Sequence, residues 1–129
     1  MKIRLIACCM IALSSTSVFA AEYYCDVLVK RDLEHIYSEQ EHKKWQWGVK
    51  IVDDGASSTI SRCSFSTSEN RVTCDDYPVE YMHADPYVGI KKYYYFTGHF
   101  DVQLYPDMQF IENNGRGSIG RGQCRLTRP

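Results

Sequence analysis

The chain has 129 residues, a net charge of −1 and a hydrophobic fraction of 44%. This length suits one small domain. Because nucleic-acid binding needs a clustered excess of positive charge, we expect no nucleic-acid partner.

Residues 1–20 have the three parts of a secretory signal peptide: a positively charged start, an apolar stretch over residues 5–13 and a small-residue cleavage site before Ala21. The apolar stretch is shorter than the roughly 20 residues that a membrane-spanning helix needs. A lipoprotein-type cut before Cys8 is disfavoured, because almost no apolar stretch would precede it. We therefore predict a mature chain over residues 21–129, without a membrane span, in the periplasm or outside the cell.

Short runs of tyrosine, tryptophan, valine and isoleucine favour strands over helices in the mature chain. Alternation of side chains predicts a first strand over residues 23–29. A second strand is predicted over residues 45–52, with a buried side made of Trp45, Trp47, Val49 and Ile51. The polar stretch between them, residues 32–44, leaves two interpretations open. It fits one short helix with the apolar stripe Leu33, Ile36 and Tyr37, and it fits a long, solvated loop.

A register relationship predicts a hairpin around a turn at Ser68-Glu69. This turn places Cys63 opposite Cys74. It also places Phe65 opposite Val72, on the same face as the cysteines, because strand side chains alternate. These two matches favour a hairpin with a disulfide between Cys63 and Cys74.

Two of the six cysteines belong to the signal peptide, which leaves four in the mature chain. Four cysteines in a small exported domain indicate two disulfides, for which three pairings exist. With Cys63 paired to Cys74, Cys25 pairs with Cys124 and ties the first strand to the last. Zinc is disfavoured as the use of these residues, because the usual C-x₂-C pairs are missing.

Further strands are predicted in the second half of the chain, over residues 90–96, 99–105, 109–112 and 118–126. Tyr105-Pro106-Asp107 and Asn113-Asn114-Gly115 are turn signals between them. Gly120 and Gly122 in the last strand indicate a bulge or the close approach of another strand. The predicted fold class is all-β: a small antiparallel barrel or sandwich with two disulfides and at most one short helix.

No pattern in the chain is typical of catalysis or of a metal centre. The nucleophile elbow G-x-S-x-G is missing, and disulfide-bonded cysteines offer no thiolate. Two Glu-His pairs, at residues 34–35 and 41–42, would lie two turns apart on a helix, too far apart for both histidines to bind one ion. His83 and Asp85 form the one local acid–base pairing. We therefore expect no enzyme, no cofactor and no metal.

Tyrosines and arginines are the residues from which we predict a binding surface. In a strand, Tyr94 points away from its neighbours Tyr93 and Tyr95, so the three rings cannot all be buried in one core. Tyr94 and Tyr87 are candidates for contacts with a protein or a sugar. In the glycine-rich carboxyl-terminal segment, two arginines are candidates for binding a carboxylate or phosphate: Arg116 and Arg121. The structural alternatives are tyrosines packed under loops and arginines that only cover a half-exposed strand.

The predicted mature start, Tyr23-Tyr24-Cys25-Asp26, together with a cysteine near the carboxyl end, resembles small periplasmic inhibitors of c-type lysozyme. The resemblance implies a disulfide-tied antiparallel β-barrel with an inhibitory role. It covers only the ends of the chain, and the middle lacks the Ser-Gly-containing loop with which such inhibitors enter the lysozyme cleft. No site residue is transferred from it.

The sequence therefore predicts an exported small binding protein. The first expectation is a protein partner in the periplasm or outside the cell, with the chain acting as an inhibitor or immunity factor toward a cell-wall hydrolase or a toxin. The second is a small-ligand or glycan-binding barrel that uses exposed tyrosines.

Overall fold

The computed structural model describes residues 20–129, so the signal-peptide prediction lies outside the described residues except for Ala20. The strands are β1 (Ala21–Arg31), β2 (Gly48–Asp53), β3 (Thr59–Ser66), β4 (Arg71–Pro78), β5 (Tyr81–Ala84), β6 (Lys91–Tyr95), β7 (Phe100–Leu104), β8 (Gln109–Asn113) and β9 (Ile119–Arg128). One α-helix, α1 (Glu39–Trp45), lies between β1 and β2, and short 3-10 helices span Gly55–Ser57 and Phe96–Gly98. In this part of the chain no helix is long and apolar enough to cross a membrane.

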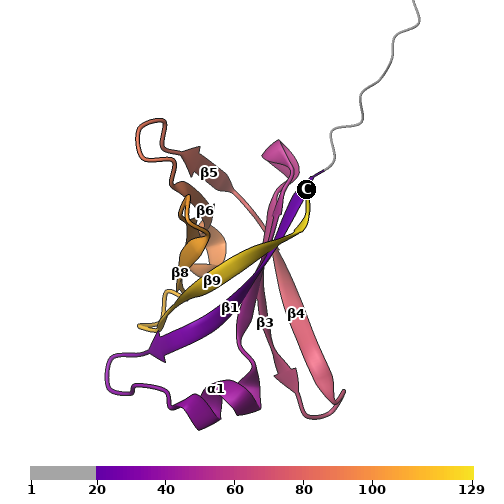
Figure 1. Cartoon of the computed structure of the whole chain (residues 1–129), viewed down its shortest axis with the longest axis vertical. Coiled ribbons are helices and arrows are strands. Elements are labelled where there is room, and N and C mark those ends of the chain that lie inside the picture. The colour runs from indigo at the N-terminus through magenta and orange to yellow at the C-terminus, as the bar shows by residue number, and fades with distance from the viewer. Residues whose placement is uncertain (1–19) are drawn as a thin grey trace, which may run out of the picture.

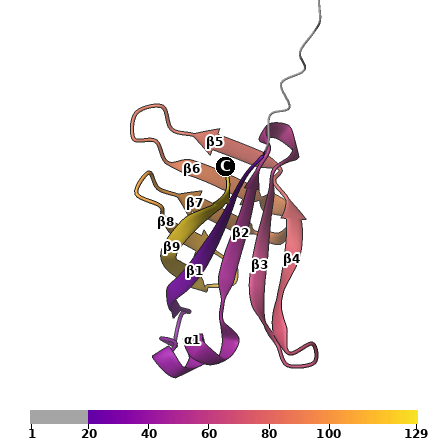
Figure 2. The ribbon, with the colours of Figure 1, turned by 45° about the vertical axis from the view of Figure 1, so that its right-hand side comes forward.

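All nine strands belong to one antiparallel sheet with the order β4-β3-β2-β1-β9-β8-β7-β6-β5. The sheet curls into a half-barrel: in Figure 2, β1 to β4 run upright while β5 to β8 cross behind them. The first and last strands are neighbours, so both ends of the described chain lie at the same end of the sheet (Figure 1). The predicted all-β antiparallel fold is confirmed.

The concave face of the sheet holds the hydrophobic core. As predicted from alternation, Phe100, Val102 and Leu104 all point inward and are buried. Tyr93 is fully buried beside them, whereas Tyr94 alternates to the other face. The remaining core residues are Cys25, Val27, Val49, Ile51, Ile60, Phe110 and Cys124.

Both predicted disulfides are present, and each joins residues that face each other on neighbouring strands. Cys25 of β1 pairs with Cys124 of β9 inside the core. Cys63 of β3 pairs with Cys74 of β4, and Phe65 lies opposite Val72 as the predicted register requires. Disulfides of this kind fit a protein of an oxidising compartment.

A bulge in β1 places two consecutive apolar side chains at the surface. The pairing of β1 with β9 shifts register between Val27 and Val29. Gly122 lies beside the shift, and a Cβ there would come within 3.0 Å of the Leu28 backbone nitrogen. The prediction of a bulge or close approach at this glycine is confirmed. As a result Leu28 and Val29 are 62% and 41% exposed, although they follow the buried Val27.

The region between β1 and β2 combines the two predicted alternatives. It is a loop up to Ser38 and a helix from Glu39 to Trp45. The predicted helical stripe of Leu33, Ile36 and Tyr37 is wrong, because all three lie in the loop before the helix begins. The predicted start of the second strand at Trp45 is also wrong, because a capping box formed by Ser38 and Glu41 starts a helix that includes Trp45.

Candidate functional site

A groove of about 940 Å³ lies beside α1. We call it the α1 groove. One side is the outer surface of β1, from Tyr24 to Val29, and the other is the loop at Ile36 and Tyr37 together with α1. Figure 1 shows α1 below the end of β1, to which a loop connects it. Trp47, Val72 and Arg125 complete the lining.

Part of the α1 groove is apolar and open to solvent. Leu28 and Val29 are displayed there by the β1 bulge, and Ile36 of the loop is 69% exposed. Ile119 of β9 is also exposed, and it pairs with Arg31, two residues beyond Val29 on the same face of the sheet. Contiguous exposed apolar surface with polar surroundings is typical of an interaction site.

Aromatic contacts fix the loop and helix onto the sheet. The ring of Trp47 makes edge contacts with Tyr37 and His42, with centroids 4.9 and 5.3 Å apart. The ring of His35 makes a further edge contact with Tyr37, with centroids 4.5 Å apart. The ammonium of Lys30 lies 4.7 Å from the centroid of Trp47, close enough for a cation–π interaction. The wall of the groove is therefore anchored through one tryptophan.

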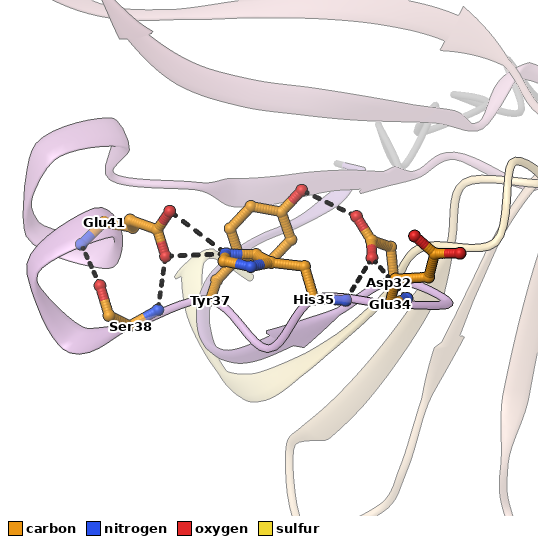
Figure 3. Close-up of polar contacts among 6 residues, drawn as sticks. All are labelled: Asp32, Glu34, His35, Tyr37, Ser38 and Glu41. Carbon is orange, nitrogen blue, oxygen red and sulfur yellow. Dashed lines mark hydrogen bonds and ion pairs between the residues drawn. The ribbon is translucent and has the colours of Figure 1, made fainter.

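A chain of hydrogen bonds stiffens the same loop, as Figure 3 shows. The carboxylate of Asp32 accepts from the amides of Glu34 and His35 at 3.0 and 2.8 Å. The Glu41 carboxylate accepts from the Ser38 amide at 2.6 Å and lies 3.1 Å from His35 Nε2. Residues 32–38, which connect β1 to α1, thus have a defined shape in the absence of a partner.

These bonds also shift the ionisation of both carboxylates. Amide hydrogen bonds from Glu34 and His35 hold the pKa of Asp32 below its usual value. The Ser38 amide, and then His35, lower the pKa of Glu41 in the same way. The hydrogen bonds therefore favour the ionised form of both carboxyl groups.

One polar atom of the groove wall has no partner. His42 Nδ1 is buried, and it makes no hydrogen bond to any residue that the structure describes. An unsatisfied buried polar atom costs free energy in the folded state.

Charged residues close one end of the α1 groove. Arg125 donates a 2.7 Å hydrogen bond to Asp26, and its guanidinium lies 4.9 Å from the centroid of Tyr24. Burial and the nearby Asp26 carboxylate raise the pKa of Tyr24. The lining of the groove thus combines apolar side chains of β1 and the loop with polar and charged residues at this end and along α1 (Glu39, His42, Lys43 and Gln46).

The four residues predicted from the sequence to form a binding surface do not come together, and none of them lines the α1 groove. Tyr87 is 93% exposed in the turn between β5 and β6. Tyr94 lies on the convex face of β6, where its ring stacks on Phe96 with centroids 5.2 Å apart. Arg121 lies on the convex side of β9 opposite Val29, and Arg116 lines a separate polar cleft.

Several of the residues considered for catalysis and metal binding make contacts within the fold. Asp85 accepts hydrogen bonds from the amides of Tyr87 and Val88 and so closes the β5–β6 turn. Among residues 20–129, no group of three or more His, Cys, Asp or Glu side chains is arranged to hold a metal ion. His35 belongs to the loop network and His42 packs on Trp47.

Sequence reasoning missed the α1 groove as a site. The signal was present in the consecutive apolar residues Leu28 and Val29, which break the alternation of the first strand opposite Gly122.

Comparison of the chain with protein-family models, with curated proteins and with solved structures finds no match. The resemblance to lysozyme inhibitors stays a prediction.

Proposed function

We propose that this chain is an exported binding protein that takes an apolar segment of a partner protein in the α1 groove. The observation that carries the proposal is the groove itself, a cavity of about 940 Å³ bordered by exposed Leu28, Val29 and Ile36. Apolar side chains at the centre of an interface, with a polar rim, are the usual anchors of protein recognition.

The ordered wall of the groove supports the proposal that the groove binds a partner. The loop network and the Trp47 contacts order the wall in advance, so a partner does not bear the cost of ordering it. The polar and charged residues Glu39, Lys43 and Gln46 of α1 lie beside the apolar side chains of the groove. A partner segment with an apolar side chain and neighbouring polar groups would match both features.

The proposed location is the periplasm or the outside of the cell. Two disulfides need an oxidising compartment to form and persist. The predicted signal peptide points to the same compartment. A partner there, such as a cell-wall hydrolase or a toxin, would make the chain an inhibitor or immunity factor.

The test is affinity capture with the oxidised protein and two matched variants. Leu28→Asp places a charge in the groove. Val88→Asp is the control, because it places a charge outside the groove, at a similarly exposed aliphatic side chain in the β5–β6 turn. Exported proteins of the producing cell and a set of c-type lysozymes serve as the sample. We expect one protein to bind wild type and Val88→Asp, and to bind Leu28→Asp at least about 30-fold more weakly, the effect of losing an interface anchor. Equal retention by both variants contradicts the proposal.

A second candidate function, glycan binding, is favoured by an aromatic platform formed by Tyr81, Tyr94 and Phe96. The rings of Tyr94 and Phe96 are nearly parallel, at 10°, and Tyr81 lies 5.9 Å from Tyr94. Tyr81 and Phe96 are 52% and 56% exposed. Exposed, mutually stacked rings suit contacts with the apolar face of a sugar, because a ring offers a flat apolar body at low entropic cost.

Retention on insoluble chitin, cellulose and peptidoglycan distinguishes this candidate. Tyr94→Ala removes the central ring of the platform, and Tyr87→Ala removes an isolated exposed ring as a control. Glycan binding by the platform predicts that Tyr94→Ala loses retention while Tyr87→Ala keeps it. No retention of wild type on any of the three polymers rules the candidate out.

A further inference from the structure

A polar cleft of about 350 Å³ lies on the concave side of the half-barrel. Its walls come from β1, β2, β3, β4, β8 and the turn after β8. Five charged residues line it: Lys30, Arg62, Asp75, Glu112 and Arg116. Trp47 contributes to the walls of both cavities.

Glu112 places a carboxylate in this cleft although only 5% of the residue is exposed. A Cβ at Gly120 would lie 2.6 Å from Glu112 Oε1, so the glycine leaves the space that the carboxylate occupies. Lys30 Nζ lies 3.9 Å away, and no residue that the structure describes donates a hydrogen bond to the carboxylate. Its oxygens therefore remain free to accept hydrogen bonds from a bound molecule.

The two arginines of the cleft are held by means other than ion pairs. The guanidinium of Arg62 lies over the rings of Tyr77 and Phe100, 5.1 and 4.8 Å from their centroids. The backbone of Arg116 is fixed in the turn, where its amide donates to Asn114 Oδ1 at 2.8 Å. Within residues 20–129 neither Arg62 nor Arg116 forms a salt bridge. The guanidinium groups of both arginines are therefore available to an anionic group.

We propose that this cleft binds a small acidic sugar, with its hydroxyl groups on the Glu112 and Asp75 carboxylates and its acidic group on Arg62 and Arg116. Three basic side chains face two acidic ones, so an anion fits, and the carboxylates are acceptors suited to hydroxyl donors. The volume lies at the small end of ligand sites and suits a single sugar unit. The proposal is independent of partner binding in the α1 groove.

The acidic group has two sources, a carboxylate or a phosphate, and the experiment separates them. The full chain, produced by export with both disulfides formed, is titrated with glucuronate, glucose 6-phosphate and glucose, and amide and arginine Nε–Hε signals are followed by NMR. We expect saturable shifts at Arg62 and Arg116 with a Kd of about 1 mM for at least one of the acidic sugars, a value reasonable for a ligand of this size. Glucose should bind at least about tenfold more weakly. The tighter of the two acidic sugars identifies the source.

Two variants on the same hairpin provide the control. Arg116→Gln removes a cleft guanidinium from an exposed turn, and Arg121→Gln removes an exposed guanidinium on the convex side. We expect Arg116→Gln to weaken binding of the acidic sugar about tenfold, the effect of losing one charge-assisted contact, and Arg121→Gln to leave it unchanged. The proposal is overturned if no acidic sugar gives saturable shifts, if glucose binds equally well, or if the two variants behave alike.

Discussion

The Tyr93 hydroxyl donates a 2.8 Å hydrogen bond to Asp53 Oδ2 and so joins β6 to the end of β2, strands that are not neighbours in the sheet. Lys91 Nζ lies 3.3 Å from the same carboxylate oxygen. Burial raises the pKa of Tyr93, and the Asp53 carboxylate raises it further, so the phenol stays protonated and donates. This contact helps hold the two halves of the curved sheet together.

Tyr93→Phe removes this hydrogen bond and keeps the buried ring. We expect the free energy of unfolding to fall by about 2 kcal/mol, because a bond to a charged acceptor is lost and the carboxylate stays partly desolvated. Urea unfolding of wild type and variant measures this difference in the free energy of unfolding. Tyr95→Phe is the matched control, since that hydroxyl makes no hydrogen bond within residues 20–129 and its ring stacks on Tyr77 at 5.0 Å. Equal effects of the two changes would show that the contact to Asp53 contributes nothing.

The two disulfides should contribute unequally to stability. Cys25–Cys124 spans 99 residues of sequence and Cys63–Cys74 only 11. In the chain-entropy model these closures contribute about 4.7 and about 3 kcal/mol, respectively. Replacing Cys25 and Cys124 by alanine should therefore lower the melting temperature more than replacing Cys63 and Cys74. The reverse order would place the main constraint in the β3–β4 hairpin.

Glu112 should make the protein less stable as pH rises. Burial raises the pKa of its carboxyl, although Lys30 and Arg62 act in the opposite direction. The folded form therefore binds this proton more tightly than the unfolded chain. The associated stability is fully present below the ordinary glutamate pKa and is lost as pH rises through the raised pKa of the folded state. The stability of Glu112→Gln relative to wild type should consequently increase from acidic to neutral pH in urea unfolding, and a constant difference would contradict this.

Ser38→Ala tests whether the wall of the α1 groove is ordered in advance. The Ser38 hydroxyl accepts from the Glu41 amide at 3.2 Å as one half of the capping box. Loss of this hydrogen bond should lower the free energy of unfolding by about 1 kcal/mol and speed amide hydrogen exchange in α1. Ser68→Ala, in the exposed β3–β4 turn, is the comparison. Unchanged exchange in α1 would mean that packing on Trp47 alone orders the helix.

The sequence predicted the sheet well where alternation and turn chemistry agree. Phe65 and Val72 set the β3–β4 register, and Asn113-Asn114-Gly115 marked the last hairpin, where Gly115 has a φ of +72°. The edge strand β5 was not predicted, because Tyr81 to Ala84 is short and only Met82 packs against the core. Its existence depends on pairing with β6, which is tertiary information.

The candidate sites depend still more on long-range placement. Arg116 and Arg121 look equivalent in the sequence, but a turn and a strand direct them to opposite sides of the sheet. Nothing in the sequence distinguishes Glu112 from a surface glutamate. In the structure, Gly120 of the neighbouring strand leaves room for its carboxylate. Such relationships arise from pairing between strands, and spacing along the chain does not encode them.

The most direct measurement is photo-crosslinking in the cell that produces the protein, with a photoreactive amino acid placed at Ile36 or at Val88. The two side chains are similarly exposed, at 69% and 57%, but only Ile36 borders the α1 groove. We predict a covalent adduct with one partner protein from position 36 and none from position 88. An adduct from position 88 alone, or none from position 36, would contradict a partner-binding role for the groove.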